Sequence, residues 1–137
     1  MNSPFLKAFA PPVVLMGAIF LLSSVPGEVD DGILKILTAL DPKLQNLLHI
    51  PLFALLQVLW LRAIVKGGLA SWKNVLLCLG ITLGYGLFDE IHQMFVPGRY
   101  ASLLDVLLNL LGAVLGTLGF WWATRKSHPT HSTGLPR

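Results

Sequence analysis

The sequence predicts an all-α integral membrane protein, a four-helix transmembrane bundle with a short interfacial helix between the first and second spans. Two observations predict this fold. Hydrophobic residues make up 54% of the 137 positions and charged residues only 12%, which is about half the charged fraction of a typical soluble domain. The apolar residues also gather into long runs that end at polar or Pro-Gly stretches.

The four spans follow from the length that a helix needs to cross a bilayer, roughly 20 predominantly apolar residues. We expect them at about 9–25, 47–65, 74–96 and 100–123. Pro26-Gly27 ends the first span and Pro97-Gly98 ends the third, because proline and glycine interrupt helices. A cleaved signal peptide is the alternative for the first span, but the stretch SSVPGE lacks a small-x-small cleavage site.

Two further segments complete the predicted organisation. In residues 30–43, DDGILKILTALDPK, apolar side chains recur at near-helical spacing between acids and a proline, which predicts a short amphipathic helix at the membrane surface. The last residues, SHPTHSTGLPR, are polar and contain two prolines. We therefore expect residues 1–126 to form one four-span domain and residues 127–137 to form a disordered cytoplasmic tail.

Lysine and arginine predict the orientation, because short cytoplasmic loops carry the excess of basic residues. The loop between the first two spans holds two basic residues against four acidic ones. Basic residues instead gather at the other edge of the spans: Lys7, Arg62, Lys66, Lys73, Arg125 and Lys126. We expect a multi-pass protein of the cell membrane with both termini and the middle loop cytoplasmic. Trp60, Trp72, Trp121 and Trp122 fall near that same edge, where indoles are enriched.

Polar residues concentrate at the opposite, outer edge, above all in the run DEIHQMFVPGRYASLLDVLLNLLG of residues 89–112. Helical spacing places Gly86, Glu90 and Gln93 in one stripe of the third span, with Asp89 on its flank and His92 pointing away. The fourth span carries a second stripe, Ser102, Asp105, Asn109, Gly112 and Gly116.

The two deeper residues of the second stripe, Gly112 and Gly116, are predicted to pack against a neighbouring helix, because small residues four apart let helices approach closely. Ser24 closes the first span and His49 opens the second on the same side of the membrane. Cys78, the one cysteine, lies in an apolar run and is expected to be buried.

A carboxylate at mid-bilayer costs about 2.5–3.5 kcal/mol, so these polar groups must face one another or water. In the structural interpretation, Arg99 pairs with the acids and holds the helices together. In the functional interpretation they form a pocket for a polar ligand, lined by Ser24, His49, Glu90, Gln93, Arg99, Ser102, Asp105 and Asn109.

The chemistry of that pocket is left open by the sequence. Glu90, Asp105 and His49 are candidates for acid–base catalysis, and the planar guanidinium of Arg99 suits a phosphate or carboxylate. A metal site built from the same three residues is an alternative, but their spacing is not diagnostic. No metal and no cofactor is therefore expected.

With these residues in place, the chain resembles the VanZ-like membrane proteins over all four spans. The specific part is an acid-x-x-Gln, a Gly-Arg turn and Ser-x-x-Asp-x-x-x-Asn-x-x-Gly, found here as Glu90, Gln93, Gly98, Arg99, Ser102, Asp105, Asn109 and Gly112. The stretch FLLSSVPG and the pair His49 and Phe53 also fit. Where the family usually has Asp-Lys before this histidine, the chain has Gln45-Asn46.

The resemblance implies a membrane protein whose founding relative is associated with low-level resistance to the glycopeptide teicoplanin; it names no reaction. Two functions follow as hypotheses. One is an envelope protein that binds a polar lipid or a lipid-linked cell-wall precursor, and the other is a membrane enzyme acting on a lipid-linked or phosphate-bearing substrate. The lack of a nucleophile motif favours the first. A transporter is disfavoured because the acids cluster at one edge, and no basic patch indicates nucleic acid.

Overall fold

The computed structural model describes residues 3–27, 42–65 and 69–127. It confirms the all-α fold. The helices are α1 (Pro4–Ser23), α3 (Pro42–Leu47), α4 (His49–Ile64), α5 (Trp72–Gln93) and α6 (Leu103–Ser127). Residues 30–41 of the predicted interfacial helix and residues 128–137 of the predicted tail lie outside the described part of the chain.

Four helical segments are long and apolar enough to cross a membrane: Pro4–Ser23, Leu44–Ile64, Trp72–Gln93 and Leu103–Lys126. The second of them joins α3 to α4 across Leu48. Pro51 explains the interruption, because it has no N–H to donate to the carbonyl of Leu47. The helical path nevertheless resumes at once, since Leu52 N donates to Leu48 O at 3.2 Å.

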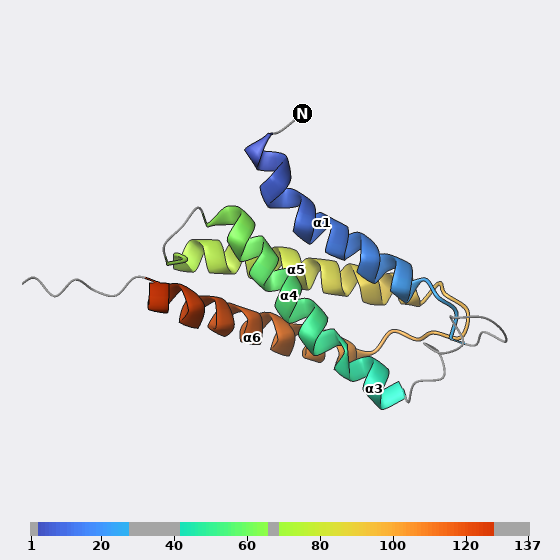
Figure 1. Ribbon diagram of the computed structural model, residues 1–137. Coiled ribbons are helices and arrows are strands. Elements are labelled where there is room, and N and C mark those ends of the chain that lie inside the picture. Colours follow the sequence, from blue (N-terminus) through green and yellow to red (C-terminus); the bar gives the residue numbers. More distant parts are fainter. Residues whose placement is uncertain (1–2, 28–41, 66–68, 128–137) are drawn as a thin grey trace, which may run out of the picture.

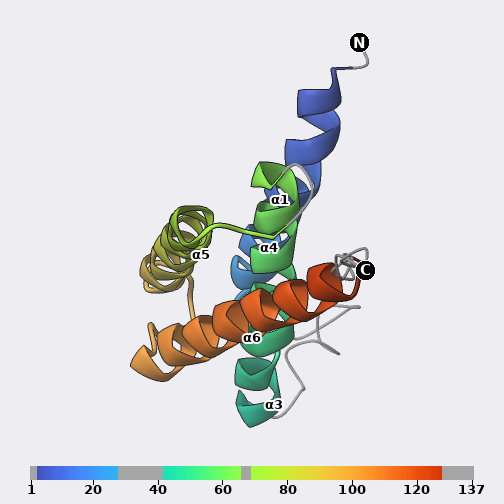
Figure 2. The same ribbon diagram turned by 90° about the vertical axis from the view of Figure 1, so that its left-hand side faces the viewer.

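The helices alternate in direction along the chain (Figure 1). As a result α1 and α5 end, and α3 and α6 begin, at the same end of the molecule, here called the polar end. The view turned by 90° shows α4 running past α1 while α6 crosses it (Figure 2). Helix α4 contacts each of the other three long helices, and its contact with α6 is the most extensive in the molecule.

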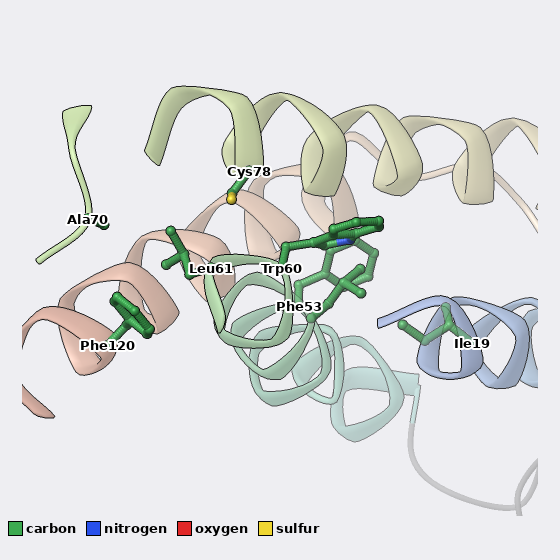
Figure 3. Close-up of a cluster of buried hydrophobic side chains, with 8 residues drawn as sticks. Ile19, Phe53, Trp60, Leu61, Ala70, Cys78 and Phe120 are labelled. Carbon is green, nitrogen blue, oxygen red and sulfur yellow. The ribbon is translucent and has the colours of Figure 1, made fainter. Parts of the chain in front are cut away.

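The apolar core follows from this central position of α4. Phe53, Leu56 and Leu61 on α4 are fully buried, and Cys78 from α5 is buried beside them, as its apolar surroundings in the sequence predict (Figure 3). Trp60 extends the core toward the other end of the bundle, where its ring meets Phe9 of α1 edge to face at 6.1 Å.

A set of polar side chains, of which Gln57 and Thr82 are fully buried, crosses the middle of the bundle. Gln57 of α4 donates from Nε2 to Thr117 Oγ1 of α6 at 3.1 Å, and its Oε1 accepts from Thr82 Oγ1 of α5 at 2.8 Å. Thr117 in turn donates to Ala113 O at 2.9 Å. These bonds tie three helices together and leave the amide of Gln57 satisfied, so we interpret this network as structural.

Helix α6 reaches α4 through two glycines. A Cβ added to Gly112 would strike the carbonyl oxygen of Ile50 and lie 3.1 Å from Ala54 N. A Cβ on Gly116 would strike the carbonyl oxygen of Ala54 and lie 3.0 Å from its Cα. Because the atoms in the way belong to the backbone of α4, no side chain at either position can be accommodated by a rotamer change.

We predict that Gly116→Leu lowers the free energy of unfolding by about 1–3 kcal/mol or more, because it forces α6 away from α4. The matched control is Gly119→Leu on the same helix, where an added Cβ would have no neighbour within 4 Å. Unfolding in mixed detergent micelles, followed by circular dichroism, measures both variants. Equal stability of the two would contradict the close contact.

Candidate ligand-binding site at the polar end

The turn between α5 and α6 closes the polar end. Gly98 adopts a φ of 72°, a left-handed conformation that glycine reaches without steric cost. Gly27, just after α1, donates from its N–H to Pro97 O at 3.0 Å, and a Cβ on Gly27 would strike the carbonyl of Gly98. The end of α1 is therefore fastened to the turn by direct backbone contact.

Helix α5 ends earlier, and α6 begins later, than the sequence predicts. The apolar residues up to Val96 suggested a longer α5, but Val96 N bonds Gln93 O at 3.1 Å and Arg99 N bonds Val96 O at 3.1 Å, which is turn geometry. Helix α6 begins at Leu103 because Ser102 caps it: Ser102 Oγ accepts from Asp105 N at 3.4 Å.

Three sequence-predicted residues meet at one point of the polar end. His49 from the start of α4, Glu90 from α5 and Asp105 from α6 have side-chain nitrogen and oxygen atoms within 4.8 Å of one another. Glu90 and Asp105 are 3% and 5% exposed. His49 Nε2 lies 3.9 Å from Glu90 Oε1.

Two other polar atoms of this cluster are held by the backbone. Glu90 Oε2 accepts the N–H of Ser102 at 2.8 Å, so the acid of α5 also neutralises the amino-terminal end of α6. His49 Nδ1 lies 3.1 Å from Asn46 O. A carbonyl only accepts hydrogen bonds, so Nδ1 carries the proton in this contact and Nε2 faces Glu90.

Asn109 lies one turn deeper on α6 and is fully buried. Gly86 of α5 makes room for it, since a Cβ there would come within 2.9 Å of Asn109 Nδ2. Among the described residues neither the nitrogen nor the oxygen of its amide has a hydrogen-bond partner. The same holds for Glu90 Oε1 and Asp105 Oδ1.

A second polar group, between α5 and α1, contains two residues that the sequence analysis did not select. Asp89 Oδ1 accepts from Ser23 Oγ at 2.6 Å, and Asp89 Oδ2 accepts from Gln93 Nε2 at 3.1 Å. All three side chains are buried. The sequence placed Asp89 only on the flank of the helical stripe that contains Glu90. The packing of α1 against α5 shows that this flank faces Ser23.

Ser24 lies in a different environment from the one expected. Its Oγ contacts His92 Nε2 at 2.9 Å, and the ring of His92 stacks on Phe20 at 4.3 Å between centroids. His92 points away from Glu90, as the spacing predicts. Because Ser24 contacts His92, Ser24 also lies away from Glu90. Ser23 rather than Ser24 faces Asp89.

Arg99 also differs from the expectation that it pairs with the acids. Its Nε donates to Val25 O at 3.2 Å, which joins the α5–α6 turn to the end of α1. Within residues 3–27, 42–65 and 69–127, the basic and acidic side chains that approach each other at this end are His49 and Glu90, with Nε2 and Oε1 3.9 Å apart.

A cavity of about 140 Å³ lies among the ends of α1, α3, α4 and α5. One wall is apolar and is formed mainly by leucines and the ring of Phe53. The polar lining consists of Ser23, Gln45, His49, Asp89, Gln93 and Arg99. His49 thus belongs both to the cavity and to the cluster with Glu90 and Asp105.

The helices and this site define a multi-pass helical membrane protein with a polar, partly apolar-walled site at one end of its bundle. The chain belongs to the VanZ/LLP1 family, whose sequence model matches residues 9–124. The match therefore runs from α1 through α6. No curated protein and no solved structure matches the chain significantly.

We predict that Asp89→Ala lowers the free energy of unfolding by about 1–3 kcal/mol, because it leaves the amide nitrogen of Gln93 buried without its acceptor and leaves Ser23 Oγ only its bond to Phe20 O. Leu87→Ala, at an exposed position of the same helix, is the control and should change stability little. Thermal unfolding in detergent compares the two. A loss no larger than that of the control would show that Asp89 does not hold α1 to α5.

Proposed function

We propose that this chain is a protein of the cell membrane whose polar end faces outward, and that the cavity there binds the anionic headgroup of a membrane lipid or a lipid-linked cell-wall precursor. The observation that carries the proposal is the cavity itself, which joins an arginine and several hydrogen-bonding groups to an apolar wall at the end of a membrane-spanning bundle.

The orientation is supported by the opposite end of the bundle. There Lys73 lies over the ring of Trp72, Arg125 over Trp121 and Lys126 over Trp122, at 5.8, 4.1 and 3.7 Å from the ring centroids. Paired tryptophan and basic side chains are typical of a membrane interface, and the basic excess is typical of its cytoplasmic side. This arrangement supports the proposal that both ends of the described chain, before α1 and after α6, lie in the cytoplasm.

The class of ligand is argued from the chemistry and size of the cavity. An arginine guanidinium binds phosphate through paired hydrogen bonds, and Arg99 lines the cavity with its Nε already fixed by Val25 O. The volume of about 140 Å³ is below the roughly 300–1,000 Å³ that encloses a drug-sized molecule. It suits a phosphate and the first carbons attached to it, with the remainder of the lipid outside.

Binding of this kind supports a role in the envelope. By holding headgroups at the outer surface, we propose, the chain alters envelope properties, including the access of the glycopeptide teicoplanin. The family membership of the chain supports this proposal, and its test is a comparison of teicoplanin susceptibility with and without the gene in the same host.

A second candidate function is a membrane-embedded enzyme that acts on a lipid-linked or phosphate-bearing substrate by acid–base chemistry. It is favoured by one observation, the approach of His49 Nε2 to Glu90 Oε1 at 3.9 Å, because a buried acid beside an imidazole can exchange a proton with a bound substrate. Conversion of a radiolabelled polyprenyl phosphate or pyrophosphate by the purified chain would favour the enzyme. Binding without conversion would favour the first proposal.

We predict that Arg99→Lys weakens the binding of phosphatidylglycerol by at least about tenfold, since an ammonium cannot reproduce the paired bonds of a guanidinium. Native mass spectrometry of the chain released from detergent measures bound lipid directly. Arg62→Lys, at the other end of α4, is the matched control. Equal lipid retention by both variants would count against a headgroup site at Arg99.

The orientation makes a separate prediction. In a Cys78→Ala background, Tyr100→Cys should react with a membrane-impermeant maleimide in intact cells, and Leu69→Cys should react only after permeabilisation. Both positions are well exposed, at 85% and 54%, so access across the membrane decides the result. Labelling of both from the same side would overturn the four-span orientation.

A further inference from the structure

The cluster of His49, Glu90 and Asp105 has the composition of a metal site. From the positions and the burial of these three side chains we infer that the cluster binds a divalent transition-metal ion. Zn²⁺ and Mn²⁺ fit its ligand atoms best. An imidazole nitrogen and two carboxylates are the ligands that such ions accept, whereas Ca²⁺ and Mg²⁺ favour oxygen alone. The inference does not depend on lipid binding.

The distances suit this assignment. The donor atoms of the three side chains lie within 4.8 Å of one another. Ligands about 2.1 Å from a tetrahedral metal are separated by about 3.4 Å. His49 Nε2 and Glu90 Oε1, at 3.9 Å, are too far apart for a hydrogen bond, yet close enough for an ion to draw both inward by small side-chain rotations.

The atoms that would bind the ion are the ones that lack partners. Glu90 Oε1 and Asp105 Oδ1 are buried without a hydrogen-bond partner among the described residues, and the residues are 3% and 5% exposed. Leaving such an atom unpaired costs about 1–3 kcal/mol, and more when it is charged. Two orphaned carboxylate oxygens from different helices at one point indicate that a cation belongs there.

Two of the atoms that would not bind the ion are already held. Glu90 Oε2 accepts from Ser102 N at 2.8 Å, and His49 Nδ1 faces Asn46 O at 3.1 Å. A histidine that ligates a metal characteristically donates its other N–H to a carbonyl or carboxylate, which leaves the free lone pair on the ligating nitrogen. His49 has the matching contacts, because Nδ1 meets Asn46 O and Nε2 faces Glu90.

Charge supports the same conclusion. Glu90 and Asp105 are carboxylates buried close together, and a divalent ion that binds them offsets their charge. Arg99 acts on the charge of Asp105 from nearby, but among the described residues it forms no salt bridge with either acid, and its Nε donates to Val25 O. Three protein ligands leave at least one coordination position open, as in metal sites that bind a further ligand. Asn109 is fully buried one turn below Asp105, and its amide oxygen has no hydrogen-bond partner among the described residues.

The test uses the full chain, purified in detergent without a histidine tag and stripped with a chelator. After incubation with Zn²⁺ and desalting, elemental analysis should find about one zinc per chain. Glu90→Gln and Asp105→Asn, which keep the side-chain shape, should each weaken Zn²⁺ binding at least about tenfold. Asp89→Asn changes the neighbouring buried acid in the same way and should retain binding.

Two further measurements distinguish zinc binding at this site from the effects of misfolded variants and from zinc bound by the terminal histidines. X-ray absorption at the zinc edge of the wild-type chain should show nitrogen and oxygen ligands with a single imidazole. The double variant His128→Gln/His131→Gln should bind as the wild type does. Failure to bind stoichiometric zinc, a spectrum with two or more imidazoles, loss of binding in the double variant, or full binding by Glu90→Gln and Asp105→Asn would each overturn the inference.

Discussion

The polar end depends on how closely α6 approaches the backbone of α4. Gly112 and Gly116 remove the side chains that would separate the two helices, and the carbonyls of Ile50 and Ala54 lie where their Cβ atoms would be. The stripe that holds these glycines continues outward to Asp105. Once the glycines are seated, the chain has little freedom in where that carboxylate lies, and it falls opposite His49, the first residue of α4.

The molecule contains buried polar groups of two kinds, and the difference between them guides the functional interpretation. Gln57 in the middle of the bundle has its amide oxygen and nitrogen both bonded to threonines, so it holds three helices together and needs nothing more. At the polar end Glu90 and Asp105 each keep an oxygen that has no hydrogen-bond partner in the described part of the chain, although both are buried. Hydrocarbon makes such atoms costly, and a partner from outside the chain resolves that cost.

Neighbouring acids on one helix serve two different partners. Asp89 and Glu90 follow one another on α5 and therefore point about 100° apart, the rotation of one residue in a helix of 3.6 residues per turn. Asp89 meets Ser23 of α1, while Glu90 meets the N–H of Ser102 before α6 and the ring of His49. Helix α5 thus joins the cavity beside α1 to the cluster beside α6, and His49 belongs to both.

The sequence by itself determined the four spans, because bilayer thickness sets the length of an apolar run, and it determined which residues of α5 and α6 share a face, because helical periodicity is a local property. It could not determine which faces meet. That Ser23 rather than Ser24 reaches Asp89, and that Arg99 bonds a carbonyl of the α1 end instead of an acid, follows from the rotation of α1 against α5 and from the turn at Gly98. Those are set by packing between segments more than 60 residues apart. The sequence predicted that His49, Glu90 and Asp105 share one site, from helical spacing and the cost of polar groups in a bilayer. Which of their atoms lie next to one another was decided by the close packing of α6 on α4.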